Sequence, residues 1–183
     1  MTHSNADAAP LLVENLPLFK SMNFDNGVLD LACGTGRNGL LLASINIPVT
    51  FADNSKAAIH RLTELLAGQE YTGECWLVDL EQDVNPLAGK EYDGVLVFNY
   101  LHRPLFGAIR AAIRPGGLIF YETFTVKQCE YGKPSNPDFL LQPSELRDCF
   151  DDWEILHYFE GERVNPRRAI ASLIARRPQL GHE

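Results

Sequence analysis

The sequence predicts an α/β fold: a doubly wound, mostly parallel seven-stranded sheet that ends in an antiparallel C-terminal strand pair. Three observations predict it. Apolar strand-like segments alternate with helix-like segments along most of the chain, which is typical of βαβ units. A glycine-bearing turn joins the first strand to its helix. The last two strand-like segments have no helix between them, so they must run antiparallel.

The first strand, turn and helix occupy residues 28–43. Val28 and Leu31 bound a buried strand, and Gly34 and Gly36 allow a sharp turn. The helix begins near Arg37, so its free N–H groups point into the space above the glycines. This arrangement predicts a ligand cradle at the carboxyl edge of a parallel sheet.

The remaining elements follow from hydrophobic periodicity and from turn residues. Further strands are expected at residues 48–53, 74–79, 91–98, 118–123, 153–159 and 169–175. Helices are expected at residues 10–20 (interrupted or restarted at Pro17), 55–68, 104–113 and 143–150. Residues 1–9 are polar and are expected to fray.

Length and composition indicate one globular domain spanning residues 1–183, with ordinary apolar content and a formal charge of −8. The four cysteines lie far apart and form no Cys-x-x-Cys pair. They are expected to be reduced thiols, with no metal site and no disulfide framework. No apolar run is long enough to span a membrane, and no secretory signal precedes the domain. The expected location is therefore the cytoplasm, and the oligomeric state is not indicated.

Two acidic residues at strand ends fit a nucleoside ligand. Asp53 ends the second strand 19 residues after Gly34, where a carboxylate can accept hydrogen bonds from both ribose hydroxyls. Asp53 could instead cap the following helix. Asp79 ends the third strand and can accept from an adenine amino group, while the Leu80 N–H donates to a ring nitrogen. Asp79 could also be a solvated acid, since Glu81 follows closely.

The turn also carries the pattern acid-x-small-x-Gly-x-Gly, formed by Asp30, Ala32, Gly34 and Gly36. This pattern resembles motif I of the class I S-adenosylmethionine-dependent methyltransferases, with alanine at the usual first glycine. Residues 114–118, Arg-Pro-Gly-Gly-Leu, resemble the Pro-Gly-Gly turn of that family. Chain length, the helix at 144–150 and the strand at 171–176 are similar to the small tellurite-resistance-type methyltransferases. The alternative is a glycine turn in an unrelated α/β protein.

The resemblance implies S-adenosylmethionine as cofactor and methyl transfer to a small-molecule acceptor as function. Two alternatives stay open: methylation of RNA or protein by the same fold, and a non-catalytic nucleotide-binding protein. A carboxylate four residues before the second glycine would repel a pyrophosphate and attract a methionine ammonium group. The cofactor-binding candidates are Asp30, Ala32, Cys33, Gly34, Gly36, Asp53, Asn54, Asp79, Leu80 and Asn99.

The catalytic candidates follow the fourth and fifth strands. Tyr100 and His102 stand where an acceptor would meet the methyl group, and His102 could act as a general base or be structural. Glu122 lies in an apolar strand, where an acid is costly unless paired. The loop at residues 127–141 is expected to be a lid, a substrate wall or a plain surface excursion.

Nucleic acid is not the expected substrate. Residues 99–102, Asn-Tyr-Leu-His, lack the Asn/Asp-Pro-Pro-Tyr/Phe motif of enzymes that methylate DNA amines. Five arginines in the tail could form an RNA surface, but no aromatic residues interleave with them to stack on bases. The negative net charge also disfavours a phosphate backbone. These arginines are Arg163, Arg167, Arg168, Arg176 and Arg177.

Overall fold

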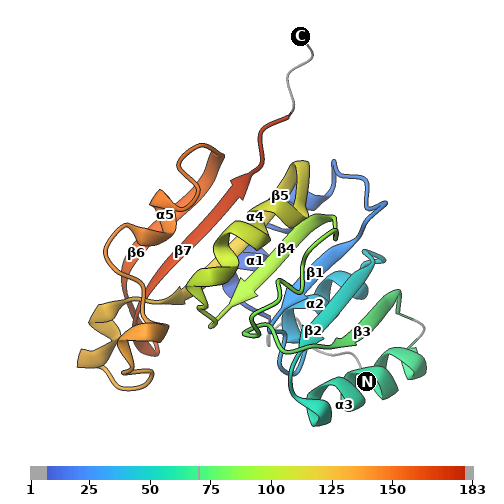
Figure 1. The fold of residues 1–183 in the computed structure, drawn as a ribbon, viewed down its shortest axis with the longest axis horizontal. Coiled ribbons are helices and arrows are strands. Elements are labelled where there is room, and N and C mark those ends of the chain that lie inside the picture. The colour runs from blue at the N-terminus through green and yellow to red at the C-terminus, as the bar shows by residue number, and fades with distance from the viewer. Residues whose placement is uncertain (1–7, 70, 180–183) are drawn as a thin grey trace.

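The computed structural model describes residues 8–69 and 71–179. Its centre is a seven-stranded sheet in the order β3-β2-β1-β4-β5-β7-β6 (Figure 1). β1 to β5 run parallel, and β7 runs antiparallel to both β5 and β6. The predicted fold class is confirmed. The strands are β1 (Val28–Leu31), β2 (Val49–Asp53), β3 (Gly73–Leu77), β4 (Tyr92–Phe98), β5 (Ile113–Phe124), β6 (Glu154–Val164) and β7 (Arg167–Arg176).

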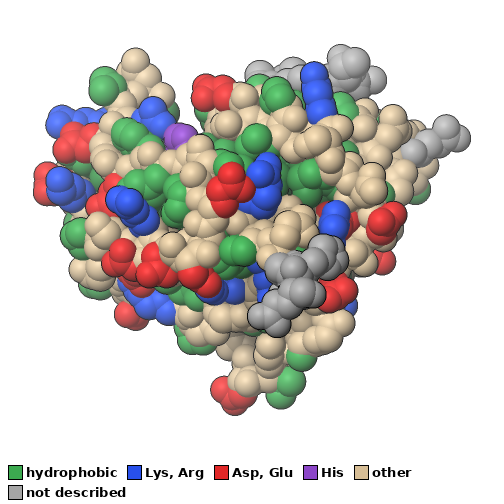
Figure 2. All heavy atoms as spheres, turned by 90° about the horizontal axis from the view of Figure 1, so that it is seen from above, with side chains coloured by type: hydrophobic (Ala, Val, Ile, Leu, Met, Phe, Trp, Pro, Cys, Tyr) green, Lys and Arg blue, Asp and Glu red, His purple; other side chains and the backbone are tan. Residues whose placement is uncertain are grey.

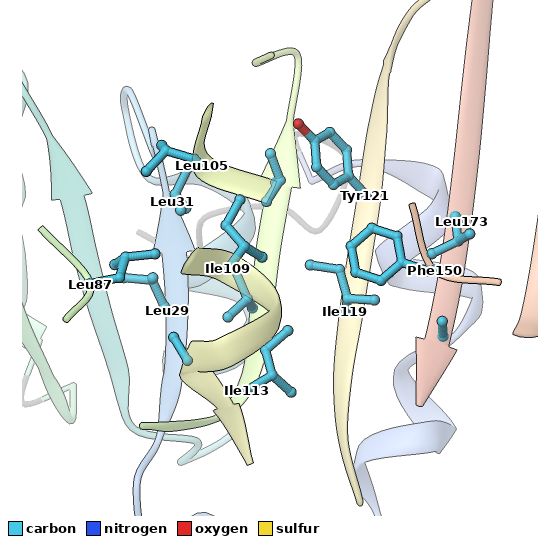
Figure 3. Packing of buried hydrophobic residues seen from close by; sticks show 14 of the residues in the cluster. Leu29, Leu31, Leu87, Leu105, Ile109, Ile113, Ile119, Tyr121, Phe150 and Leu173 are labelled. Carbon is cyan, nitrogen blue, oxygen red and sulfur yellow. The ribbon is translucent and has the colours of Figure 1, made fainter. Parts of the chain in front are cut away.

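Helices cover both faces of the sheet. One face packs against the N-terminal helices, α2 and α3, while the other packs against α4 and α5. Figure 3 shows the second core, in which Ile109 and Phe150 meet the sheet residues Leu29 and Ile119. The helices are α1 (Pro10–Glu14), η2 (Leu16–Phe19), α2 (Arg37–Ala43), α3 (Lys56–Gln69), η3 (Arg103–Leu105), α4 (Phe106–Ala112), η4 (Val126–Glu130), η5 (Pro137–Phe139) and α5 (Glu145–Asp148). None of the described helices is long and apolar enough to span a membrane.

Several boundaries differ from the sequence prediction: β5 begins at Ile113 rather than residue 118, and β6 continues to Val164 rather than residue 159. Ala8 and Ala9 do not fray: both are buried, and the Ala9 N–H donates to Asn38 Oδ1 at 2.8 Å. The frayed segment expected at residues 1–7 lies outside the described residues. The first helix ends at Glu14, before Pro17, and a 3₁₀ turn follows. The third strand ends at Leu77, so Asp79 lies in the loop beyond it.

The Pro-Gly-Gly turn lies inside the first part of β5 rather than before it. The pairing of β5 with β4 shifts register between Tyr92 and Gly94 at this point. Gly116 adopts a left-handed φ of 80°, which glycine adopts without steric cost. The turn therefore works as an irregularity within a strand that is paired on both sides of it.

Gly39 allows α2 to lie directly on the sheet. A Cβ atom there would come within 2.5 Å of Phe51 Cε1 and 2.8 Å of Asp30 Oδ2. Gly39 is therefore required by the packing of α2 on the sheet.

We predict that Gly39→Ala lowers the free energy of unfolding by about 1–3 kcal/mol, because overpacking forces side chains apart. Gly68→Ala is the matched control, since Gly68 is also helical and has no atom within 4 Å of an added Cβ. That change should stabilise the protein by about 0.5–1 kcal/mol through helix propensity. Urea unfolding measures both, and equal effects of the two substitutions would contradict this packing.

Candidate functional site

The turn after β1 is built from left-handed backbone. Ala32 has φ 53°, Gly34 φ 55° and Gly36 φ 75°. Left-handed backbone disfavours alanine by roughly 1–2 kcal/mol, which accounts for the glycine usual at the position of Ala32. An added Cβ at Gly36 would come within 2.5 Å of Leu62, whereas nothing lies within 4 Å of one at Gly34. The turn is therefore packed below Gly36 and open above Gly34.

Two carboxylates, those of Asp30 and Asp53, hold this turn by accepting hydrogen bonds from its backbone N–H groups and from the helix that follows. Asp30 Oδ2 accepts the Gly39 N–H at 2.9 Å, which joins β1 to α2. Asp53 Oδ2 accepts the Gly34 N–H at 2.7 Å, and its Oδ1 accepts the Ser55 N–H at 2.8 Å. Ser55 Oγ in turn accepts the Ala58 N–H, so Ser55 caps α3.

Asp30 is 2% exposed, so its carboxylate lies beneath the turn. Burial raises the pKa of this carboxyl to about 7, while the bond from the Gly39 N–H and the charge of Arg37 oppose the rise. The expected contact of Asp30 with a methionine ammonium group stays a prediction. Cys33 lies beside it, and burial followed by the charge of Asp30 raises the pKa of its thiol, which disfavours the reactive thiolate.

The first cavity, called cavity A, lies beside this turn. It has a volume of about 170 Å³. Six sequence-predicted residues meet there: Ala32, Asp53, Asn54, Asp79, Leu80 and Tyr100. Val78 and Glu81 complete the lining, so three of its eight residues are acidic and none is basic. Asp79 Oδ1 accepts the Glu81 N–H at 3.0 Å, which shapes the loop after β3.

The second cavity, called cavity B, lies at the ends of β4 and β5. Its volume is about 270 Å³. Its lining residues are Glu81, Asn99, Tyr100, Leu101, Thr123, Phe124, Pro134 and Phe139. Glu81 and Tyr100 belong to both cavities, so the two spaces meet at these side chains. Pro134 and Phe139 come from the 127–141 loop, which therefore lines this cavity, and its role as a substrate wall stays a prediction.

The backbone changes direction where β4 ends. Asn99 has a left-handed φ of 56°, and its N–H donates to the Glu122 carbonyl at 2.8 Å. A non-glycine residue in this region carries strain that clusters at functional sites. The Tyr121 hydroxyl donates to the Tyr100 carbonyl at 3.0 Å, which fixes the next peptide. Burial, and then the Glu81 carboxylate, raise the pKa of the Tyr100 phenol, whose oxygen has no hydrogen-bond partner among the described residues.

Two of the three catalytic candidates do not line these cavities. Glu122 points to the face that carries α2, where Arg168 Nη2 lies 3.6 Å from its Oε1. Burial raises the pKa of Glu122, and the positive charges around it, first that of Arg168, oppose the rise. His102 precedes η3, and its carbonyl accepts the Leu105 N–H. Neither cavity has His102 in its lining.

Glu81 is a lining residue that the sequence alone did not single out. It follows Asp79 in an acidic loop, where it looks like a solvated charge. The signal that could have identified it is its position two residues beyond Asp79, on the same strand-end loop. Among the described residues, no group of three His, Cys, Asp or Glu side chains could hold a metal ion.

Comparison with known proteins finds similar sequences and similar folds. Residues 28–117 match the family of methyltransferase domains. The chain is 29% identical over 140 residues to "Hemagglutinin 1" of Eikenella corrodens, an alignment that covers 72% of this chain and 45% of that protein. This chain thus spans less than half of that relative.

Solved structures share the fold, and two of them serve as examples. TehB from Haemophilus influenzae superposes with a TM-score of 0.72 at 22% identity, covering 91% of this chain and 61% of that one. Magnesium protoporphyrin IX methyltransferase from Synechocystis PCC 6803, with bound SAH, gives 0.68 at 14% identity, covering 91% and 80%. The class of fold is therefore the Rossmann-like methyltransferase fold. The methyltransferase domain at residues 28–117 and this shared fold confirm the resemblance to the class I S-adenosylmethionine-dependent methyltransferases, with TehB as a structural relative.

We predict that Asp30 contributes a fall in the free energy of unfolding as pH rises from about 4 to about 7, because buried Asp30 keeps its proton over a range in which the unfolded chain has lost it. The slope from this one group approaches 1.4 kcal/mol per pH unit. Asp30→Asn keeps an oxygen for the Gly39 N–H and should flatten the slope. Chemical unfolding across this pH range measures it, with exposed Asp83→Asn as control. An unchanged slope in Asp30→Asn would contradict the burial of a carboxyl group there.

Proposed function

We propose that the protein transfers a methyl group from S-adenosylmethionine to a small-molecule acceptor. The observation that carries the proposal is the meeting of two cavities at Tyr100 and Glu81, beside a turn that is open above Gly34. One cavity suits the nucleoside end of the cofactor and the other suits an acceptor. Their junction is the natural place for the methyl group.

The residues of cavity A fit the adenosine part of the cofactor. Asp53 uses one lone pair of each oxygen on Gly34 and Ser55, and a carboxylate has about four acceptor positions. Two positions are therefore free for ribose hydroxyls. Asp79 and the Leu80 N–H, with Val78 as an apolar neighbour, form the adenine end of the cavity. Asn54, Ala32 and Cys33 complete the surroundings of the nucleoside in this proposal.

Charge favours this cofactor over a dinucleotide. S-Adenosylmethionine supplies a methyl group on a positively charged sulfur. Asp53, Asp79 and Glu81 line cavity A without a basic residue. Three carboxylates attract a cation and repel a pyrophosphate. We therefore assign the turn with Gly34 and Gly36 to the methionine part, with Asn99 beside the sulfur.

Catalysis in this proposal is alignment more than acid–base chemistry. Cavity B orients the acceptor against the methyl group, and its aromatic side chains exclude water. The aromatic faces of Tyr100 and Phe124 stabilise positive charge by about 0.5–2 kcal/mol each. Because His102 and Glu122 do not line the cavities, His102 would reach the acceptor only through a water molecule or a movement of its side chain. Glu122 holds Arg168 instead.

An RNA substrate is the less favoured alternative because the tail arginines already have partners. Arg168 faces Glu122, Arg176 binds Glu154, and Arg177 donates to the carbonyl of Arg110. Arg167 lies over the Tyr131 ring and Arg163 over the Phe159 ring. On the face drawn in Figure 2, Lys and Arg side chains lie among Asp and Glu side chains rather than in a separate basic patch.

Calorimetry should show binding of adenosylhomocysteine and none of NAD⁺. Asp53→Ala should weaken that binding by about 1.5–3 kcal/mol, the range for a lost hydrogen bond to a charged group. Asp83→Ala removes the same charge from an exposed position in the segment after β3 and serves as control. Tight NAD⁺ binding without adenosylhomocysteine binding would contradict the proposal. Equal affinity of Asp53→Ala and wild type would move the ribose contact to another residue.

Incubation with cofactor labelled in its methyl group tests the acceptor class. We expect label in small molecules of a metabolite extract, and none in purified RNA or protein offered separately. Label in either polymer alone would overturn the small-molecule assignment. With the acceptor identified, His102→Ala should leave turnover within a few fold, since His102 does not line cavity B. A loss on the order of 10²–10⁴-fold would instead make His102 the general base.

A further inference from the structure

The outer wall of cavity B is not part of the sheet. Pro134 and Phe139 stand in the segment between β5 and α5. The base of this segment is fixed to the sheet, because the Leu141 N–H donates to the Phe124 carbonyl at 2.9 Å. Phe139 itself is 49% exposed, so burial alone does not fix its ring. Its own 3₁₀ turn is closed by a bond from the Phe139 N–H to the Asn136 carbonyl at 3.0 Å, so a further interaction is needed to join this turn to the other side of the cavity.

Arg103 supplies that interaction. Its Nη1 donates to the Asp138 carbonyl at 3.0 Å and its Nη2 donates to the Leu140 carbonyl at 2.8 Å. These two residues flank Phe139 on either side. One guanidinium group therefore holds both neighbours of the wall residue.

The same guanidinium is anchored at its other edge. Its Nε donates to Glu145 Oε1 at 2.6 Å and its Nη2 donates to Glu145 Oε2 at 2.9 Å, a bidentate pair. Glu145 raises the pKa of Arg103. Partial burial acts to raise the pKa of Glu145, but hydrogen bonds from Arg103 and the Gln142 N–H lower it below its usual range. The planar fork of arginine suits this set of four acceptors, which a lysine ammonium cannot span.

Arg103 also connects the wall to the opposite side of the cavity. It opens η3, two residues after Leu101, which lines cavity B with Asn99 and Tyr100. The separation in sequence between Arg103 and Glu145 is 42 residues. The clamp therefore sets the gap between the end of β4 and the Phe139 ring.

The lining of cavity B defines what this gap admits. Its large side chains are Tyr100, Phe124 and Phe139, and its one charged residue is the carboxylate Glu81. A flat, apolar molecule fits between aromatic faces. An anion would meet Glu81 without a compensating cation in the lining, whereas an amine would be attracted to it.

We propose that Arg103 is a positioning residue that clamps Phe139 as the wall of an acceptor site for flat, apolar molecules that are neutral or positively charged. Only the identification of the bound molecule as a methyl acceptor rests on the proposed function. The clamp and the selectivity of cavity B can be measured without turnover. Arg103 contacts no reacting atom in this account and acts through the position of the Phe139 ring.

The test is ¹⁹F NMR titration of adenosylhomocysteine-saturated protein with 4-fluorobenzylamine and with 4-fluorobenzoate. We expect the amine to bind and the benzoate to bind roughly two- to fivefold more weakly, since Glu81 is exposed and an exposed charge pair contributes only a few-fold in affinity. Arg103→Gln and Phe139→Ala should each weaken amine binding roughly three- to tenfold, the range for losing one aromatic contact. The affinity for adenosylhomocysteine should stay within about twofold, because neither residue lines cavity A.

Arg110→Gln is the matched control. Arg110 also joins a carboxylate and a carbonyl, those of Asp152 and Cys149, but touches no residue of the wall. The Arg110→Gln substitution should leave amine binding unchanged even if it lowers the melting temperature of the protein. Amide hydrogen exchange at Phe139 and Leu140 should accelerate in Arg103→Gln and stay as in wild type in Arg110→Gln.

Glu145→Gln provides a second variant if Arg103→Gln fails to fold. It weakens the anchor but keeps both carbonyl bonds, so it should loosen amine binding less than Arg103→Gln does. Unchanged amine binding in the folded clamp variants would overturn the role of Arg103. Equal affinity for benzoate and amine would overturn the charge selectivity. Failure of wild type to bind adenosylhomocysteine would instead count against the proposed function.

Discussion

The site depends on two carboxylates that hold one left-handed turn. Asp30 reaches forward from β1 to the Gly39 N–H, and Asp53 reaches across from β2 to the Gly34 N–H. β1 and β2 are adjacent parallel strands, so their carboxyl ends meet at one edge of the sheet. The open space above Gly34, the start of α2 and the start of α3 are all set by these two side chains. Loss of either would release backbone N–H groups that these carboxylates now bind.

At this edge of the sheet, the acids that line the cavities and the buried Glu122 lie on different sides of the sheet. The acids of the cavities stand at the end of β2 and in the loop after β3, without basic residues in the lining. Glu122 points to the other face and meets Arg168 there. Because neighbouring side chains of a strand point to opposite faces, Thr123 and Glu122 are adjacent in sequence but serve different surroundings. The acidic cavity can therefore attract a cation while the buried acid of β5 is neutralised separately.

Much of the fold was predictable because its signals are local. The continuous apolar run of β4 and the alternation of strands and helices follow from neighbouring residues alone, and so does the antiparallel pair at the end. Strand ends also identified Asp53, Asp79 and Tyr100 as neighbours, since parallel strands end at one edge. Ala8 and Ala9 were misjudged because their burial depends on a bond to Asn38, 29 residues from Ala9.

The remaining parts of the site depend on information that periodicity does not carry. The face to which Glu122 points is set by the register of β5, and the distance of His102 from the cavities is set by the path of η3. The bonds of Arg103 join residues that are separated by 35 to 42 positions in the sequence. No local sequence pattern therefore predicts this clamp. Glu81 was not identified from the sequence because acidic residues that lie close together in a loop are usually exposed to solvent.

The most direct test of this account is a crystal structure of the protein with adenosylhomocysteine. We predict the adenine beside Val78 and Leu80, the ribose hydroxyls on Asp53, and the sulfur beside Asn99, facing the cavity closed by Phe139. A ligand bound elsewhere, or a sulfur directed away from that cavity, would contradict the proposed meeting of cofactor and acceptor.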